Sequence, residues 1–74
     1  MLKGDYLYIP ANEYGVRICD VSDPTNPRQV AYYDTVAKAK GITESGGYAY
    51  VATLKGIEVF PLYGYDAPAS SYAR

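Results

Sequence analysis

Two stretches of the sequence decide the fold, Gly4-Asp5-Tyr6-Leu7-Tyr8-Ile9 and Gly47-Tyr48-Ala49-Tyr50-Val51. Each is followed, after a turn, by a second apolar stretch: Gly15-Val16-Arg17-Ile18-Cys19 in the first case and Gly56-Ile57-Glu58-Val59-Phe60 in the second. Tyr6 and Tyr8 are each 42 residues from their counterparts Tyr48 and Tyr50, and Gly15 is 41 residues from Gly56. The chain therefore contains the same unit twice, with about one residue lost from the second turn.

The apolar side chains of both units alternate with the period of two that is typical of β-strands. This alternation predicts strands at residues 5–10, 16–21 and 28–34, a short strand at residues 42–44, and further strands after Gly47 and Gly56. A repeat of about forty residues built from short strands is typical of a β-propeller, in which each unit is one four-stranded blade. We therefore expect an all-β fold of antiparallel β-propeller blades.

The order of the predicted strands indicates an incomplete ring. With the strands of a blade named a to d from the axis outward, the chain reads b-c-d and then a-b-c. Residues 28–34 are the most polar strand and follow Pro27, which favours an outer edge; residues 42–44 suit a short inner strand. We expect one and a half blades in residues 1–62, an irregular tail in residues 63–74, and a place at the C-terminal end of a longer propeller.

Composition excludes several classes of partner. Seven basic and eight acidic residues give a net charge of −1, so nothing predicts binding to nucleic acid. Neither a signal peptide nor an apolar segment long enough for membrane insertion is present in these 74 residues. The single cysteine, Cys19, lies in a predicted strand and is interpreted as a small buried side chain rather than a reactive thiol.

The stretch from Gly15 to Pro27, preceded by Gly4 to Ile9, resembles the LVIVD repeat, which is named for its third strand. Here that strand is Val16-Arg17-Ile18-Cys19-Asp20-Val21, and the typical exit of the repeat is intact at Asp20-Val21-Ser22-Asp23-Pro24. The second unit departs at Phe60-Pro61-Leu62, where the aspartate and the turn are missing. The resemblance, which covers about residues 4–62, implies a propeller scaffold that often occurs on exported or surface proteins of microbes, and it brings no catalytic motif with it.

Few residues could carry chemistry. The chain has no histidine, which removes the commonest general base and zinc ligand, so we predict no catalytic, cofactor-binding or metal-binding residues and no enzyme activity. Asp20 is an acid inside an apolar strand, and two interpretations are open. It fixes the following turn together with Ser22, Asp23 and Pro24, which we favour, or it binds a cation with Ser22 and Asp23.

Ten tyrosines in so short a chain invite the hypothesis of a glycan or aromatic ligand. The simpler interpretation is that the tyrosines at repeat-equivalent positions fill the wedge between blades, with each hydroxyl on a polar partner. The four strand positions are Tyr6, Tyr8, Tyr48 and Tyr50. Those in the turn and the tail, namely Tyr14, Tyr63, Tyr65 and Tyr72, are freer to contact a ligand or partner.

Three hypotheses for function follow. The first is a non-enzymatic repeat segment that serves as a binding or structural scaffold for a protein or glycan ligand, its partners being the remaining blades or other copies of the chain. The alternative is a fragment of a propeller enzyme or metal-binding protein whose channel ligands lie mostly in other blades; Lys38, Lys40, Thr43 and Glu44 would be its channel-facing residues here. The third is an oligomer that completes its sheets by head-to-tail exchange.

Overall fold

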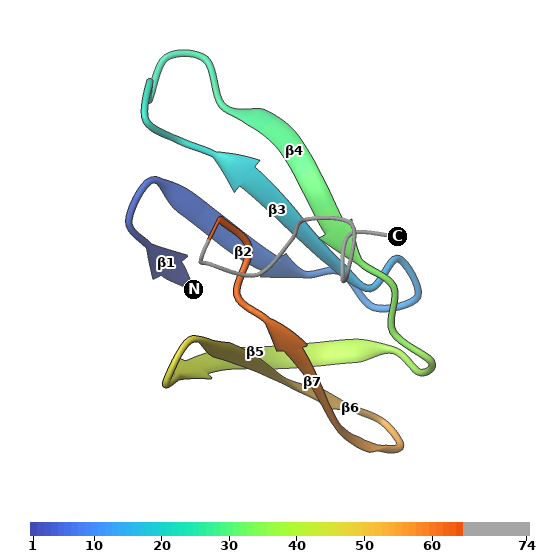
Figure 1. The fold of residues 1–74 in the computed structure, drawn as a ribbon. Coiled ribbons are helices and arrows are strands. Elements are labelled where there is room, and N and C mark those ends of the chain that lie inside the picture. The colour runs from blue at the N-terminus through green and yellow to red at the C-terminus, as the bar shows by residue number, and fades with distance from the viewer. Residues whose placement is uncertain (65–74) are drawn as a thin grey trace.

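The computed structural model describes residues 1–64, and these form two antiparallel sheets without a helix (Figure 1). The first sheet has the order β1-β2-β3-β4, and the second has the order β5-β6-β7. The strands are β1 (Leu2–Lys3), β2 (Tyr6–Pro10), β3 (Val16–Asp20), β4 (Arg28–Tyr33), β5 (Ala39–Ser45), β6 (Tyr48–Thr53) and β7 (Gly56–Pro61). The all-β class and the incomplete propeller blades expected from the repeat are confirmed.

Each sheet corresponds to one copy of the repeated unit. Strands β2, β3 and β4 hold positions b, c and d of the first blade, and β5, β6 and β7 hold positions a, b and c of the second. The strand at residues 28–34 lies at the outer edge of its sheet, as predicted from its polarity. The residues connecting the two sheets run from the outer strand β4 of one to the inner strand β5 of the other.

Two strands differ from the sequence prediction. Leu2–Lys3 forms an unpredicted strand β1 that pairs with β2 through Leu2–Leu7 and Lys3–Tyr6, so position a of the first blade is filled. Strand β5 is also longer than residues 42–44 and begins at Ala39. Two residues are too few to show alternation, and the sequence Lys38-Ala39-Lys40-Gly41 is too polar to predict a strand, although Ala39 and Gly41 pair with Thr53 and Ala52 of β6.

The core lies between the two sheets. Side chains of the first sheet point at those of the second, and together they form one buried cluster of Tyr8, Val16, Ile18, Ala31 and Tyr33 against Ala39, Ala49, Val51, Phe60 and Leu62. The ring of Tyr33 stacks on that of Phe60, with centroids 4.6 Å apart and planes 3° from parallel. Both sheets contribute large and small side chains to this cluster, as in a closely packed interior.

Tyrosine hydroxyls also join the sheets by hydrogen bonds. The Tyr33 hydroxyl donates to the Pro61 carbonyl at 2.9 Å and accepts from the Tyr63 amide at 3.1 Å. The Tyr8 hydroxyl donates to the Tyr63 carbonyl at 3.1 Å. These bonds satisfy backbone groups at the last residue of β7 and just after it, and they join the second sheet to the first.

We expect Tyr33→Phe to lower the free energy of unfolding by about 1–3 kcal/mol, because it leaves the Pro61 carbonyl and the Tyr63 amide without this partner. Tyr32→Phe is the control, since Tyr32 lies on the opposite face of the same strand and should change stability by less than about 0.5 kcal/mol. Urea unfolding of both variants measures the difference. Equal effects would show that the Tyr33 hydroxyl does not hold the sheets together.

Gly15 is required by the close approach of β4. It has a φ of +69°, and a Cβ at this position would lie 2.1 Å from the carbonyl oxygen of Tyr33. Its repeat equivalent Gly56 has open space around the same position. The second sheet ends at β7, so it has no strand that corresponds to β4 within the described residues.

Gly15→Ala should therefore destabilise the chain much more than Gly46→Ala. Gly46 also has a positive φ, +59°, but nothing lies within 4 Å of an added Cβ, so that substitution bears only the conformational cost of about 1–2 kcal/mol. Gly15→Ala adds a backbone clash that only a shift of β4 can relieve. Thermal or urea unfolding would test this, and similar losses for the two variants would contradict the close approach seen at Tyr33.

Candidate functional site

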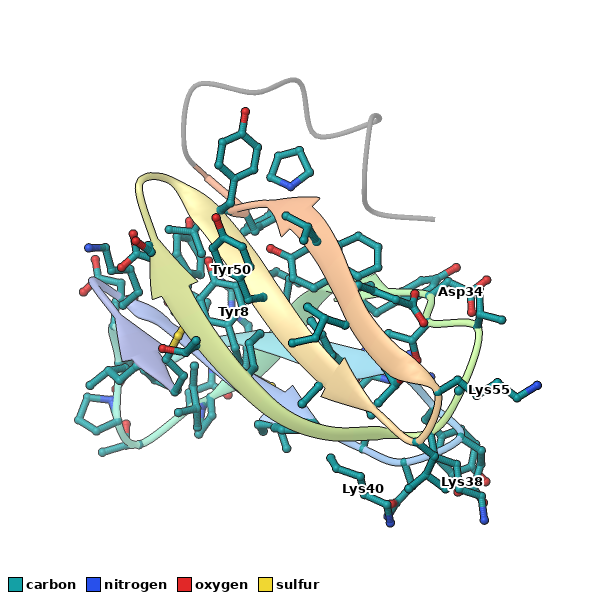
Figure 2. The ribbon with its side chains drawn as sticks, turned by 90° about the horizontal axis from the view of Figure 1, so that it is seen from below. Tyr8, Asp34, Lys38, Lys40, Tyr50 and Lys55 are labelled. Carbon is teal, nitrogen blue, oxygen red and sulfur yellow. The ribbon has the colours of Figure 1, made fainter. Side chains whose placement is uncertain are left out.

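A pocket, which we call the loop pocket, lies at one end of the two sheets, where three connections meet. These are the turn between β2 and β3, the connection between β4 and β5, and the turn between β6 and β7. The pocket is open, has a volume of about 320 Å³, and is lined by Glu13, Val36, Lys38, Leu54, Lys55 and neighbouring atoms. Figure 2 shows Lys38, Lys40 and Lys55 gathered at this end of the molecule.

Hydrogen bonds join the connections that surround this pocket. Asn12 and Ala39 exchange two backbone hydrogen bonds, of 3.1 and 3.0 Å, so the β2–β3 turn is joined directly to the start of β5. The Leu54 amide donates to the Lys38 carbonyl at 3.1 Å. The Val36 amide donates to the Glu58 carboxylate, with a shorter distance of 2.9 Å. The three connections are thereby held together at one place.

The pocket combines charge with exposed apolar surface. Lys38 and Lys55 supply two ammonium groups and Glu13 one carboxylate, while the side chains of Val36 and Leu54 are largely exposed. Such a lining suits an amphipathic ligand with a negative group. In residues 1–64 no three or more carboxylate or thiol side chains come together as a metal site would require.

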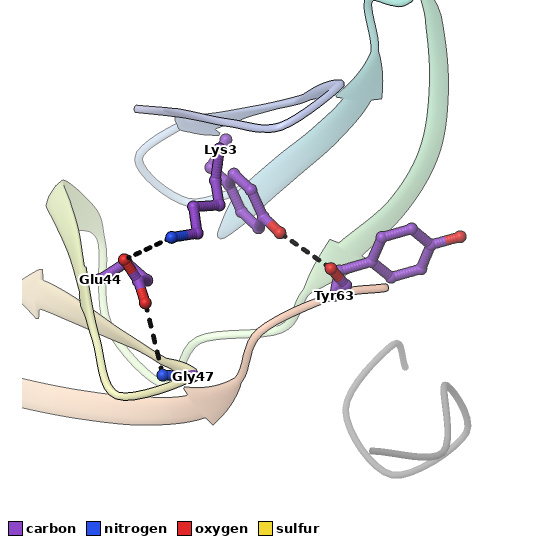
Figure 3. A network of polar contacts seen from close by, with 5 residues as sticks. Lys3, Glu44, Gly47 and Tyr63 are labelled. Atoms are coloured by element: carbon purple, nitrogen blue, oxygen red, sulfur yellow. Dashed lines mark hydrogen bonds and ion pairs between the residues drawn. The ribbon is translucent and has the colours of Figure 1, made fainter. Parts of the chain in front are cut away.

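The four residues predicted to face a channel do not converge. Lys38 and Lys40 lie by the loop pocket, where the Lys40 ammonium donates to the Asn12 side-chain oxygen at 2.6 Å. Thr43 is exposed and lies opposite Tyr50 in the sheet. Glu44, near the other end of β5, forms an ion pair with Lys3 at 3.3 Å and accepts a hydrogen bond from the Gly47 amide (Figure 3). Whether these side chains line a channel stays a prediction.

A scan against protein families supplies the identity of the repeat. A family model described as the LVIVD repeat matches residues 1–35 and again residues 37–59. The chain belongs to the LVIVD-repeat family. The first matched segment contains all of β1 to β4, and the second spans β5, β6 and most of β7, so each LVIVD unit forms one sheet. No curated protein and no solved structure gave a match.

Lys55, Glu13 and Lys3 were not predicted as site residues. Lys55 and Glu13 occupy corresponding turns of the two LVIVD units, between the strands at positions b and c. Their equivalent positions in the repeat could have predicted that they lie near each other, because corresponding turns of neighbouring blades lie at the same end of a propeller. Lys3 belongs to the unpredicted strand β1, so its pairing with Glu44 could not be anticipated.

The tyrosines divide into buried and exposed groups. Tyr8 is buried between the sheets, as the wedge hypothesis predicted, whereas its repeat equivalent Tyr50 is 37% exposed. Tyr63 was expected to be free for a ligand, but it packs edge-to-face on Tyr6 with ring centroids 5.2 Å apart. Tyr14 is exposed and lies beside the Arg17 guanidinium. Tyr65 and Tyr72 lie outside the described residues.

The aspartates after β3 organise the turn that leaves the first LVIVD strand. Asp20 Oδ1 accepts hydrogen bonds from the Ser22 hydroxyl at 2.7 Å and the Ser22 amide at 2.9 Å. Asp23 Oδ1 accepts the same pair of bonds from Thr25, at 2.7 and 3.0 Å. Pro24 lies within this exposed turn. The bonds from the two amides are the local contacts that fix Asx turns, and the two hydroxyls add side-chain bonds to the same carboxylates.

Both carboxyls hold their protons less tightly than usual. The Ser22 hydroxyl and amide lower the pKa of Asp20, with a smaller contribution from Arg28, and the Thr25 hydroxyl and amide lower the pKa of Asp23. A pKa lowered by folding contributes stability above the unfolded value of about 3.9, and this stability is lost as the pH falls through the folded pKa. Acid should therefore weaken this turn below about pH 4.

Asp20→Asn should melt a few degrees below the wild type at neutral pH, and the gap should narrow as the pH falls below the unfolded pKa. The asparagine side chain cannot ionise, so the variant lacks the stabilisation that the charged Asp20 carboxylate provides. Melting temperatures measured from neutral pH into acid test this. Asp34→Asn is the control, because Asp34 is an exposed aspartate that lies outside this turn. A constant gap at all pH values would rule out ionisation of Asp20 as the cause.

Proposed function

We propose that the chain is a non-enzymatic β-propeller segment that acts as a binding or structural scaffold, with its two sheets as consecutive blades. The observation that carries this proposal is the core, which is drawn in equal measure from residues 8–33 and residues 39–62 and lies between the two sheets. Neither sheet has a second buried face of its own among the described residues. A unit that buries its apolar residues only against its neighbour is a stacking element, as in other repeat proteins.

The scaffold would present its loop end to a ligand. The pocket at Glu13, Lys38 and Lys55 is built from connections of both blades, so stacking of the sheets creates it. We propose a protein or glycan ligand with an acidic group for this pocket, on an exported or cell-surface microbial protein as the family resemblance implied. No helix in the described part of the chain is long and apolar enough to cross a membrane.

The alternative of an enzyme or metal-binding fragment has less support. Its one carboxylate on the inner strand, Glu44, is already paired with Lys3 and with the Gly47 amide. Lys40 is likewise held by Asn12. These side chains are engaged in holding the two blades and their turns together, which is the scaffold role.

A tandem protein of two copies joined by a flexible linker tests the proposal. If the sheets are blades, the second copy stacks on the first and the free energy of unfolding more than doubles. Each large apolar side chain that becomes buried at the new junction should add about 1.5–3 kcal/mol. Urea unfolding measures the free energy of unfolding. The control is the same tandem with Val59→Lys in its first copy, which places a charge at an exposed position of β7. Two copies that unfold independently, each with the stability of the single chain, would argue against blades.

A further inference from the structure

The outward face of the sheet β5-β6-β7 is an apolar surface without a cover in the described structure. We call it the tyrosine face, and it carries Tyr48, Tyr50, Ile57 and Val59, which are 50%, 37%, 69% and 51% exposed. Tyr50 pairs directly with Val59 across β6 and β7, and Ala52 pairs with Ile57. The residues are thus neighbours in one patch, and a contiguous apolar patch of this kind marks an interaction site.

The repeat-equivalent residues of the first sheet are buried. Tyr8, Val16 and Ile18 are the equivalents of Tyr50, Ile57 and Val59, at steps of 42, 41 and 41 residues. In the first sheet these three side chains are only 1%, 0% and 0% exposed, because the second sheet packs on them. The molecule therefore shows directly what covers such a face.

The covering surface also has an equivalent elsewhere on the chain. Within the structure, the cover consists of Ala49, Val51, Phe60 and Leu62. Their repeat equivalents are Leu7, Ile9 and Cys19 on the outward side of the first sheet and Val21 just after β3, and we call this set the cover face. Every one of these side chains is apolar and at least partly exposed. Leu7 is larger than its equivalent Ala49, and Cys19 is smaller than its equivalent Phe60. The two differences in side-chain volume offset each other.

From these two faces we infer that a second copy of the chain docks its cover face on the tyrosine face of the first. This inference rests on the proposed function, because it treats each sheet as a blade. The contact is head-to-tail, so each copy still offers one free face and association can continue to a closed ring or a filament. The partner named here is a copy of this same chain, which contributes β1 to β4.

The composition of the faces favours this arrangement over a symmetric one. Placing two tyrosine faces against each other would set Tyr48 and Tyr50 against their own copies. The interface seen inside the molecule instead joins two different faces, with Tyr8 on one side and Ala49 and Val51 on the other. On the cover face, the Arg17 guanidinium lies 5.0 Å from the ring centre of Tyr32, beside Ile9, where it would form a polar rim.

Two substitutions, each blocking one face, test the inference on the full 74-residue chain. Val59→Lys places a charge on the tyrosine face, and Ile9→Lys, at a residue 40% exposed, places one on the cover face. The wild type should increase in mass with concentration in sedimentation or light-scattering measurements. Each variant alone should remain a monomer, and an equal mixture of the two should form a dimer of twice the monomer mass, because each supplies the face that the other lacks.

Asn26→Lys is the control, since Asn26 is exposed but lies in the turn between β3 and β4, outside both faces and outside the pocket. It should associate like the wild type. Ile57→Lys, at a residue 69% exposed, replaces Val59→Lys if that variant does not fold, and circular dichroism confirms folding of each protein.

Other results would overturn the inference in distinguishable ways. Association that survives in Ile9→Lys but is lost in Val59→Lys would indicate symmetric pairing of two tyrosine faces. A wild type that stays monomeric at all concentrations would remove the second copy as the partner. If the wild type stayed monomeric but the tandem protein gained stability, this inference would fail and the proposed function would stand. If the wild type stayed monomeric and the tandem protein gained no stability, both would fail.

Discussion

The contact of Tyr33 with the end of β7 is the constraint on which the rest of the structure depends. Its ring stacks on Phe60, and its hydroxyl bridges the Pro61 carbonyl and the Tyr63 amide. Tyr33 is the last residue of the outer strand β4, so one side chain fixes the edge of the first sheet to the far strand of the second. A stacked ring sets the spacing of the layers, and two directional hydrogen bonds set their register. The side chain of Tyr33 thus takes part both in the core and in the hydrogen bonds that join the two sheets.

A chain with two sheets has four faces, and one interface can cover only two of them. This explains why repeat-equivalent residues such as Tyr8 and Tyr50 have such different exposure although their local sequences are alike. Burial here is a property of the position in the stack, not of the strand itself. The chain thus keeps apolar side chains exposed that its own fold shows to be suited to burial, which is the physical basis for treating it as a stacking unit.

Much of the fold could be predicted because periodicity reports on strands directly. The 42-residue step identified the two units, and the alternation around Tyr6 and Val16 located β2 and β3. Leu2–Lys3 escaped prediction because two residues carry no period, and its strand exists only because β2 offers an open edge. The site was harder to predict. The pairing of Lys3 with Glu44 and the proximity of Lys38 and Lys55 depend on how the two sheets are placed in space. Local sequence does not predict that placement.

The loop pocket and the stacking of sheets are linked by the same geometry. The pocket exists because the β2–β3 turn of one sheet meets the β6–β7 turn of the next, with the connection through Val36 and Lys38 between them. Each of these turns belongs to a repeated unit, so each additional sheet would bring its own turn beside the last one. The β6–β7 turn at Leu54 and Lys55 would then line a second groove on its other side. If the chain is the scaffold that we propose, each added blade would bring one more such pocket to this end of the stack.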